Sequence, residues 1–285
     1  MGVPWRDFSG RFSPLKLAVF IALFGPALWT LMAFELGWLG PRAFNEAIHR
    51  IGLWTIRFLF IALAITPLRQ ILQWPRLLLV RRMVGVTAFA YAFTHLTLYT
   101  ADQMFDLVKV ATEIVLRIYL TIGIVAVLSL AALAATSTDA MIKRLGARRW
   151  QRLHRIVYVI ALLAVVHYWM QSKLEIWEPT IMAGIYIWLM GYRLLARFVG
   201  VRGRLPLLWV AGLALIAAAV TALGEAAYFR LAYGVDPMRV LDANLSLVTG
   251  IRPAPIVLGL GLAVAAAGAL RAYLPLLAKR RPRFA

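Results

Sequence analysis

Residues 151–169 read QRLHRIVYVIALLAVVHYW, a polar and basic start followed by an almost unbroken apolar run. A helix of about 20 apolar residues can cross a hydrocarbon core of roughly 30 Å, because an α-helix rises about 1.5 Å per residue. The run therefore predicts a membrane-spanning helix that begins beside a basic loop. It also holds two of the chain's four histidines, His154 and His167.

Seven further apolar blocks of similar length predict an all-α, polytopic membrane helix bundle. The eight blocks cover approximately residues 15–35, 48–68, 83–101, 115–135, 153–172, 179–198, 206–228 and 254–276. Charged residues make up only 15% of the chain, against roughly 25% in a soluble domain. No polar stretch between blocks could hold a soluble catalytic domain, so we expect any such domain on a partner. The first block is too long for a signal-peptide core and is expected to be a retained helix.

The net charge of +19 is gathered in alternate loops. Basic clusters lie before residue 17, at 69–82, 143–155 and 193–204, and after 278. The intervening loops hold most of the acidic residues: Glu35, Glu46, Asp102, Asp106, Glu113, Glu175, Glu178, Glu225, Asp236 and Asp242. By the positive-inside rule, this alternation predicts that both termini are cytoplasmic. We expect the basic clusters to contact anionic membrane lipid and not nucleic acid.

Two histidines on different predicted spans lie at the same depth. Counted from the inner ends of the third and fifth spans, His95 and His167 both lie about 20 Å out, near the outer leaflet. Facing imidazoles on two helices can supply both axial ligands of a haem iron, which favours electron transfer over ligand chemistry. Hydrogen bonding between helices is the alternative for each histidine. Because the chain has no cysteine, iron–sulfur clusters ligated by cysteine are excluded.

Five other residues are candidates for a cofactor site. His154 lies at the inner edge, level with Arg81 and Arg82, whose guanidinium groups suit haem propionates or lipid phosphates. The sequence leaves open whether a second, inner haem binds with His154 as its single histidine ligand. His49, at the outer end of the second span, could support a ligand, contact a quinone or simply be interfacial. Arg57 lies inside that span, where it could pair with a cofactor carboxylate or join two helices.

Several stretches give the chain a resemblance to a known family. They are LAITPLR (63–69), RRMVG (81–85), the helix around Tyr91 and His95, TSTD (136–139), and RWQRLHRIVY (149–158) with His167 beyond. On these stretches the chain resembles the MsrQ (YedZ) family, haem-binding bacterial inner-membrane proteins of the ferric-reductase-like transmembrane superfamily. The resemblance covers about residues 15–198.

The resemblance implies a six-helix core at 15–198 that binds b-type haem through His95, His154 and His167, with His49 at a matching position. It also implies FMN, without assigning residues to it. Residues 1–14 become a cytoplasmic N-terminus, and 199–285 a two-helix extension. Such a protein passes electrons from the quinone pool or a cytoplasmic flavin reductase to a periplasmic molybdopterin enzyme, MsrP, which reduces methionine sulfoxide in proteins. The catalytic site is then expected on the partner.

The chain departs from the wider superfamily in two respects. NADPH oxidases and ferric reductases of that superfamily carry two histidines on each of two helices, whereas the third span here has one. One haem is therefore expected, with the second open. The fused flavin and nicotinamide domain is also missing, so the donor is expected to be separate.

Three other functions remain open from the sequence. A stand-alone ferric or cupric reductase would use the same haem relay. A histidine-containing proton or ion transporter would not need haem, but its spans usually contain acidic residues at mid-depth. A purely structural membrane subunit is the third. The outer loop at 229–252 could dock a partner or simply connect two helices, and the small residues of the last span predict close helix packing.

Overall fold

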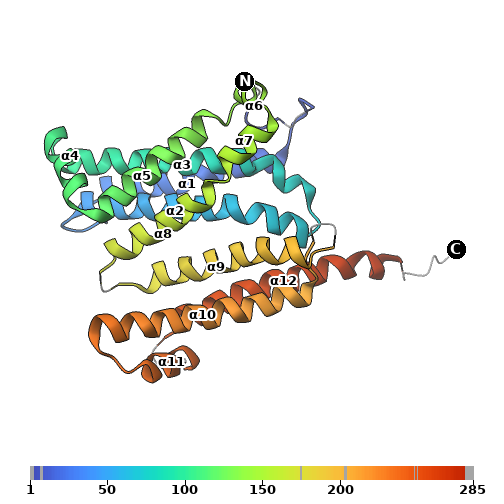
Figure 1. Ribbon diagram of the computed structural model, residues 1–285. Coiled ribbons are helices and arrows are strands. Elements are labelled where there is room, and N and C mark those ends of the chain that lie inside the picture. The colour runs from blue at the N-terminus through green and yellow to red at the C-terminus, as the bar shows by residue number, and fades with distance from the viewer. Residues whose placement is uncertain are drawn as a thin grey trace. The chain divides into compact units, whose positions relative to one another are not determined.

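The computed structural model describes residues 3–6, 9–173, 175–201, 204–246, 248 and 250–279, and their regular structure is helical (Figure 1). Within this described part, eight helical segments are long and apolar enough to cross a membrane, which confirms the predicted number of spans. Their helices are α1 (Pro14–Glu35), α2 (Ala43–Ile71), α3 (Leu78–Asp102), α5 (Ile118–Ala135), α8 (Val157–Gln171), α9 (Trp177–Phe198), α10 (Leu207–Tyr233) and α12 (Pro253–Lys279). A short 3₁₀ turn, η1 (Pro75–Leu77), precedes α3.

Three shorter helices lie in segments that the sequence analysis treated as loops. They are α4 (Leu107–Leu116), α6 (Asp139–Leu145) and α11 (Pro237–Leu245). Each begins at a side chain that accepts a hydrogen bond from a backbone N–H of the first turn, as N-caps do. The three caps are Asp106, Thr138 and Asp236. Apolar block length could not reveal these helices, because they are too short to span a membrane.

The fifth candidate span, Ala147–Gln171, contains two helices, and the predicted block at 153–172 falls mainly on the second of them. A separate helix, α7 (Ala147–His154), ends two residues before α8 begins. The Arg155 N–H bonds to the carbonyls of both Gln151 and Arg152, and the Ile156 N–H bonds to that of Leu153. This tightening to 3₁₀ geometry ends α7 and places His154 and His167 on different helices.

The chain forms two compact units. Unit 1 comprises residues 1–63 and 76–171, and unit 2 comprises 64–75 and 172–285. All four histidines belong to unit 1, whereas unit 2 contains α9, α10, α11 and α12. The division at residue 198, which follows from the family resemblance, stays a prediction.

In unit 1, a tyrosine side chain bridges a proline-induced gap in α1. Pro26 lies inside α1, where it disturbs the hydrogen-bond ladder of the helix. The hydroxyl of Tyr91 on α3 accepts a hydrogen bond from Ala27 N–H at 3.0 Å and donates one to the Leu23 carbonyl at 2.7 Å. Tyr91 is buried and lies one turn before His95 on α3. The bridge therefore fixes the helix that carries His95 against α1.

In unit 2, α9, α10 and α12 pack side by side, and α11 lies between the ends of α10 and α12 in the chain (Figure 1). Small residues bring the helices close together, as the composition of the last span predicts. Gly184 on α9 faces Thr221 and Val257, and Gly261 on α12 faces Ala214 and Trp188.

A buried acidic residue ties three elements of unit 2 together. Glu225 is 1% exposed and lies inside α10, although the sequence analysis assigned it to an outward loop. Its carboxylate accepts a hydrogen bond from the Asn244 amide at 2.7 Å and forms an ion pair with Arg252. The side-chain oxygen of Asn244, Oδ1, accepts a hydrogen bond from Ala254 N–H at 3.3 Å. A loop assignment was wrong because α10 continues to Tyr233 and the charge is neutralised inside the fold.

We expect Glu225→Ala to lower the free energy of unfolding by about 3 kcal/mol, because it leaves the partly buried Arg252 guanidinium without its carboxylate. Thermal unfolding of the detergent-solubilised protein measures this. Glu46→Ala is the matched control, since Glu46 pairs with Arg50 at 3.0 Å on an exposed surface. Its loss is expected to cost under about 1 kcal/mol. Equal effects of the two substitutions would show that the buried network is not a stabilising element.

Candidate functional site

Two histidines face each other in unit 1. His95 lies near the end of α3 and His167 near the end of α8. Their ring centres are 6.4 Å apart, and their planes are nearly perpendicular, at 84°. The predicted pairing of these two residues is thus present in the geometry, whereas their role stays a prediction.

Each of the two imidazoles is held by a backbone carbonyl on a neighbouring helix. His95 Nδ1 lies 2.8 Å from the Ile48 carbonyl oxygen, and His167 Nδ1 lies 2.7 Å from that of Tyr119. A carbonyl can only accept a hydrogen bond, so Nδ1 carries the proton in both rings. In a neutral imidazole, Nε2 then keeps its lone pair and can bind a metal.

A glycine lies four residues after each of these carbonyls and makes room for the imidazole. A Cβ atom at Gly52 would lie 2.8 Å from His95 Nδ1, and one at Gly123 would lie 2.9 Å from His167 Cε1. Real Cβ atoms do not approach other atoms this closely, so a larger residue would displace either ring. The two sites therefore share one construction, in which a helix glycine opens a notch beside the carbonyl that holds a histidine.

The distance between the rings suits an iron with two axial histidines. With a metal–nitrogen bond of about 2 Å and about 1.1 Å from nitrogen to ring centre, two rings on opposite sides of a metal have centres roughly 6.2 Å apart. The observed separation is 6.4 Å. Within the described residues, no cluster of three or more His, Cys, Asp or Glu side chains could hold a metal ion. Haem iron takes its other ligands from the porphyrin, so two histidines would be enough to hold it.

His154 lies in a separate cluster at the other end of α5. Its Nε2 shares a hydrogen bond of 3.2 Å with the Thr136 hydroxyl, just beyond α5, and its ring stacks on Trp150 at 3.9 Å. The Trp150 indole N–H donates to the Thr136 carbonyl at 2.9 Å. This network joins the TSTD and RWQRLH stretches. The role of His154 as a metal ligand stays a prediction.

The four remaining candidates lie apart from the histidine pair or at its edge. Arg82 forms an ion pair of 2.7 Å with Asp139. The positive charge of Arg81 interacts electrostatically with His154. His49 is exposed and follows Ile48 directly. The Arg57 guanidinium lies 5.0 Å from the centre of the Trp54 ring, a cation–π contact within α2. Their cofactor contacts stay predictions.

Sequence reasoning missed the two carbonyls and the two glycines. A glycine inside an apolar helix does indicate a close approach, because it costs helix stability without a packing reason. The spacing gives a second signal, since His95 follows Gly52 by 43 residues and His167 follows Gly123 by 44. Neither signal identifies the histidine as the group that fills the notch.

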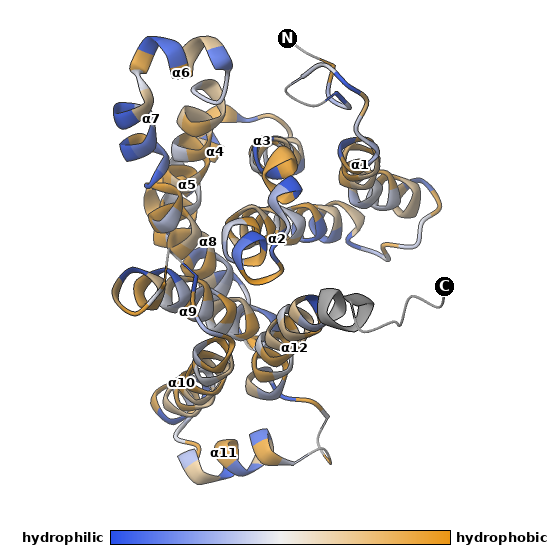
Figure 2. Cartoon of the chain, turned by 90° about the vertical axis from the view of Figure 1, so that its right-hand side faces the viewer, coloured by the Kyte–Doolittle hydropathy of each residue, from blue (hydrophilic) through white to orange (hydrophobic). Residues whose placement is uncertain are grey.

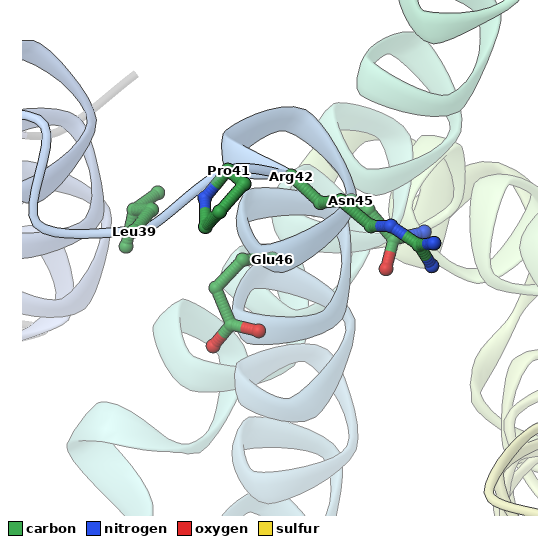
Figure 3. Close-up of a pocket in the computed structure, with 5 residues that line it drawn as sticks. All are labelled: Leu39, Pro41, Arg42, Asn45 and Glu46. Atoms are coloured by element: carbon green, nitrogen blue, oxygen red, sulfur yellow. The ribbon is translucent and has the colours of Figure 1, made fainter.

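A surface hollow of about 360 Å³ lies at the start of α2 (Figure 3). Leu39, Pro41, Arg42, Asn45 and Glu46 line it. In the close-up, the Arg42 side chain points away from Glu46. The lining includes no histidine, so the hollow is not part of the paired-histidine site.

Comparison of the sequence with known proteins identifies the family of the chain. The family described as "Ferric reductase like transmembrane component" matches residues 51–165, which include His95 and His154. A relative from Azospira oryzae is 39% identical over 189 residues, covering 66% of this chain and 81% of its own. One from Rhodospirillum rubrum is 42% identical over 190 residues, covering 66% and 89%. One from Xanthomonas oryzae pv. oryzae is 44% identical over 174 residues, covering 61% and 79%.

All three relatives are named protein-methionine-sulfoxide reductase heme-binding subunit MsrQ. No solved structure matches the chain. The identity is well above that of chance, and the aligned part covers most of each relative. The chain therefore belongs to the MsrQ family.

Proposed function

We propose that this protein is a haem-containing membrane subunit that carries electrons to a separate catalytic subunit, which reduces methionine sulfoxide in proteins. The observation that carries the proposal is the pair of facing imidazoles, His95 and His167, each with Nδ1 bound to a carbonyl and Nε2 left for a metal. Relatives that are named as haem-binding subunits support it. Bound at this pair, haem b supplies one-electron transfer.

In this proposal, the residues of the site hold and orient the haem, and they leave no room at the iron for a substrate. His95 and His167 would hold the haem iron through their Nε2 atoms, and a haem held by two histidines would supply electron transfer and would not bind oxygen or a substrate directly. The carbonyls of Ile48 and Tyr119 fix the ring orientations and make the imidazoles more basic. Because backbone carbonyls hold both imidazoles, the rings would need little rearrangement when the charge of the iron changes. This is a relay and not a site of bond chemistry.

The proposed path runs from a cytoplasmic entry to a periplasmic exit. The entry lies among basic residues, which Figure 2 shows as blue segments on α6 and α7. His154, Arg81 and Arg82 belong to this inner region in our proposal. The donor is the quinone pool or a cytoplasmic flavin reductase, and the acceptor is an MsrP-like periplasmic molybdopterin enzyme. The protein lies in the bacterial inner membrane with both termini cytoplasmic, and FMN is a second proposed cofactor without assigned residues.

We expect His95→Ala and His167→Ala each to abolish the Soret band that shifts on reduction, because each removes one axial ligand. Absorbance spectra of the purified, detergent-solubilised protein measure this. Thr97→Ala is the control: its side chain is exposed on α3, two residues from His95, and the haem content should not change. A wild-type protein without a Soret band would refute the proposal.

His154→Ala distinguishes one haem from two in the same preparations. With one haem, the haem-to-protein ratio is unchanged. With a second haem at the inner end, the ratio falls by half and the remaining spectrum is that of the His95–His167 site.

We expect Gly52→Ala and Gly123→Ala to weaken haem binding roughly tenfold or more, the scale of losing the group that orients a metal ligand. The added Cβ displaces His95 or His167 from its carbonyl, but the fold is retained because an imidazole ring can move. Titration of haem into the apoprotein measures the affinity. Gly85→Ala on α3 is the matched control, since nothing lies within 4 Å of its added Cβ. Unchanged affinity in both notch variants would mean that the glycines do not serve the site.

Electron delivery itself requires the protein in liposomes with a quinol and a purified MsrP-like enzyme. We expect reduction of methionine sulfoxide to depend on the wild-type protein and to fall to background with His167→Ala. Reduction of a ferric chelate at a similar rate without the partner would instead favour a stand-alone metal reductase.

A further inference from the structure

The segment between α4 and α5 holds one of the two carbonyls at a break in the backbone. Arg117 ends α4 and precedes α5 in an extended conformation, with φ −111° and ψ 104°. Tyr119, which supplies the carbonyl for His167, is only the second residue of α5. The first turn of a helix is its least constrained part, because its N–H groups have no partners within the helix. The Tyr119 carbonyl can accept a ladder hydrogen bond, but the N–H of the same residue has no partner within the helix, so contacts across the break help to fix its position.

Side chains on both sides of the break provide that constraint. The Arg117 guanidinium forms an ion pair with Glu113 on α4 and donates a hydrogen bond to the Tyr119 hydroxyl at 3.2 Å. The Thr121 hydroxyl donates to the Ile114 carbonyl at 2.6 Å, which joins the two helices directly. Tyr99 on α3 lies within electrostatic reach of the same groups. The Tyr119 ring is also 6.5 Å from the His167 ring.

The other imidazole is held differently. The Ile48 carbonyl that binds His95 lies in the second turn of the continuous helix α2. An ion pair of the same i, i+4 type, between Glu46 and Arg50, flanks Ile48. Because the α2 ladder already fixes this carbonyl, the pair is not needed to hold it. The two ion pairs thus differ in whether the carbonyl beside them lies in the first turn of a helix or further inside one.

The strength of the hydrogen bond from Nδ1 affects the metal. A stronger bond gives the imidazole more negative character, which raises its basicity and stabilises ferric iron over ferrous. A longer or bent bond does the opposite and raises the reduction potential. Movement of the Tyr119 carbonyl therefore changes the potential even though Tyr119 does not touch the iron.

We propose that Glu113 and Arg117 form a surface clamp that positions Tyr119, and through its carbonyl His167, and so sets the reduction potential of the haem. This rests on the proposed function, because it requires haem between His95 and His167. Arg117 and Glu113 are positioning residues in this proposal. The clamp is reachable from outside, since the Arg117 side chain is 53% exposed and that of Glu113 25%.

The test is a spectroelectrochemical titration of the purified haem-loaded protein. We expect Arg117→Met and Tyr119→Phe to raise the reduction potential, by up to a tenfold change in the equilibrium or about 59 mV for one electron. The haem-to-protein ratio should stay near that of the wild type. Arg117→Lys, which can still pair with Glu113, should restore part of the shift. Arg50→Met is the matched control and should leave the potential unchanged.

Electron paramagnetic resonance of the ferric protein measures the g anisotropy of the haem iron. A substitution that only destabilises the fold would not change this quantity in the haem-loaded protein. The near-perpendicular rings predict a low-spin signal with large g anisotropy in the wild type. Rotation of His167 should reduce this anisotropy in Arg117→Met and Tyr119→Phe, and not in Arg50→Met.

Two results overturn the clamp. The first is an unchanged potential and g anisotropy in Tyr119→Phe while Arg117→Met either leaves both unchanged or only loses haem, which leaves at most a structural role for the ion pair. The second is an equal shift in Arg50→Met, which makes the effect one of surface charge. The proposed function fails separately, when the wild type binds no haem or when His95→Ala keeps its spectrum.

Discussion

The hydrogen bond from a histidine Nδ1–H to a main-chain carbonyl is the constraint on which the site depends. It settles the tautomer, because a carbonyl can only accept, and it leaves Nε2 free to bind a metal. A helix carbonyl is normally shielded by its own neighbours, so an imidazole can reach it only where a side chain is missing. Gly52 and Gly123 supply that gap, four residues after Ile48 and Tyr119. A glycine inside a helix costs roughly 1 kcal/mol relative to alanine, and access to the carbonyl is what the helix gains.

The same construction occurs twice, in α2 with α3 and in α5 with α8. In each pair, the first helix offers a carbonyl and a glycine near its start, and the second offers a histidine near its end. The two helices of a pair therefore run antiparallel. Both pairs have the same order of carbonyl, glycine and histidine along the chain, so the second pair repeats the first. Repetition brings two similarly held histidines close together, with ring centres 6.4 Å apart. The pairs differ mainly at the start of the first helix, where α2 is continuous and α5 follows a break.

The sequence predicted those features that depend on position along the chain. The eight spans follow from the length of apolar blocks, and the pairing of His95 with His167 follows from their equal depth. Features that depend on how a helix is rotated about its axis could not be predicted. The glycine notches require that a particular face of α2 meets a particular face of α3, and nothing in a linear pattern fixes that rotation. The prediction that Glu225 lies in an outward loop failed for a related reason. In the sequence, a carboxylate near the end of a span is expected to be solvated, and only the structure shows that Asn244 and Arg252 contact it.

The break before α5 means that the two histidines of the proposed haem site are not held in the same way. Where the carbonyl lies within a helix, as at Ile48, the ladder holds it and nearby surface charges have little effect on it. Where it lies in a first turn, as at Tyr119, we propose that the side chains that bridge the break help to set its position. One of those side chains, Arg117, is also half exposed. A symmetric pair of imidazoles can thus have one ligand fixed by the fold and one adjustable from the surface, and this difference arises from where a single helix begins.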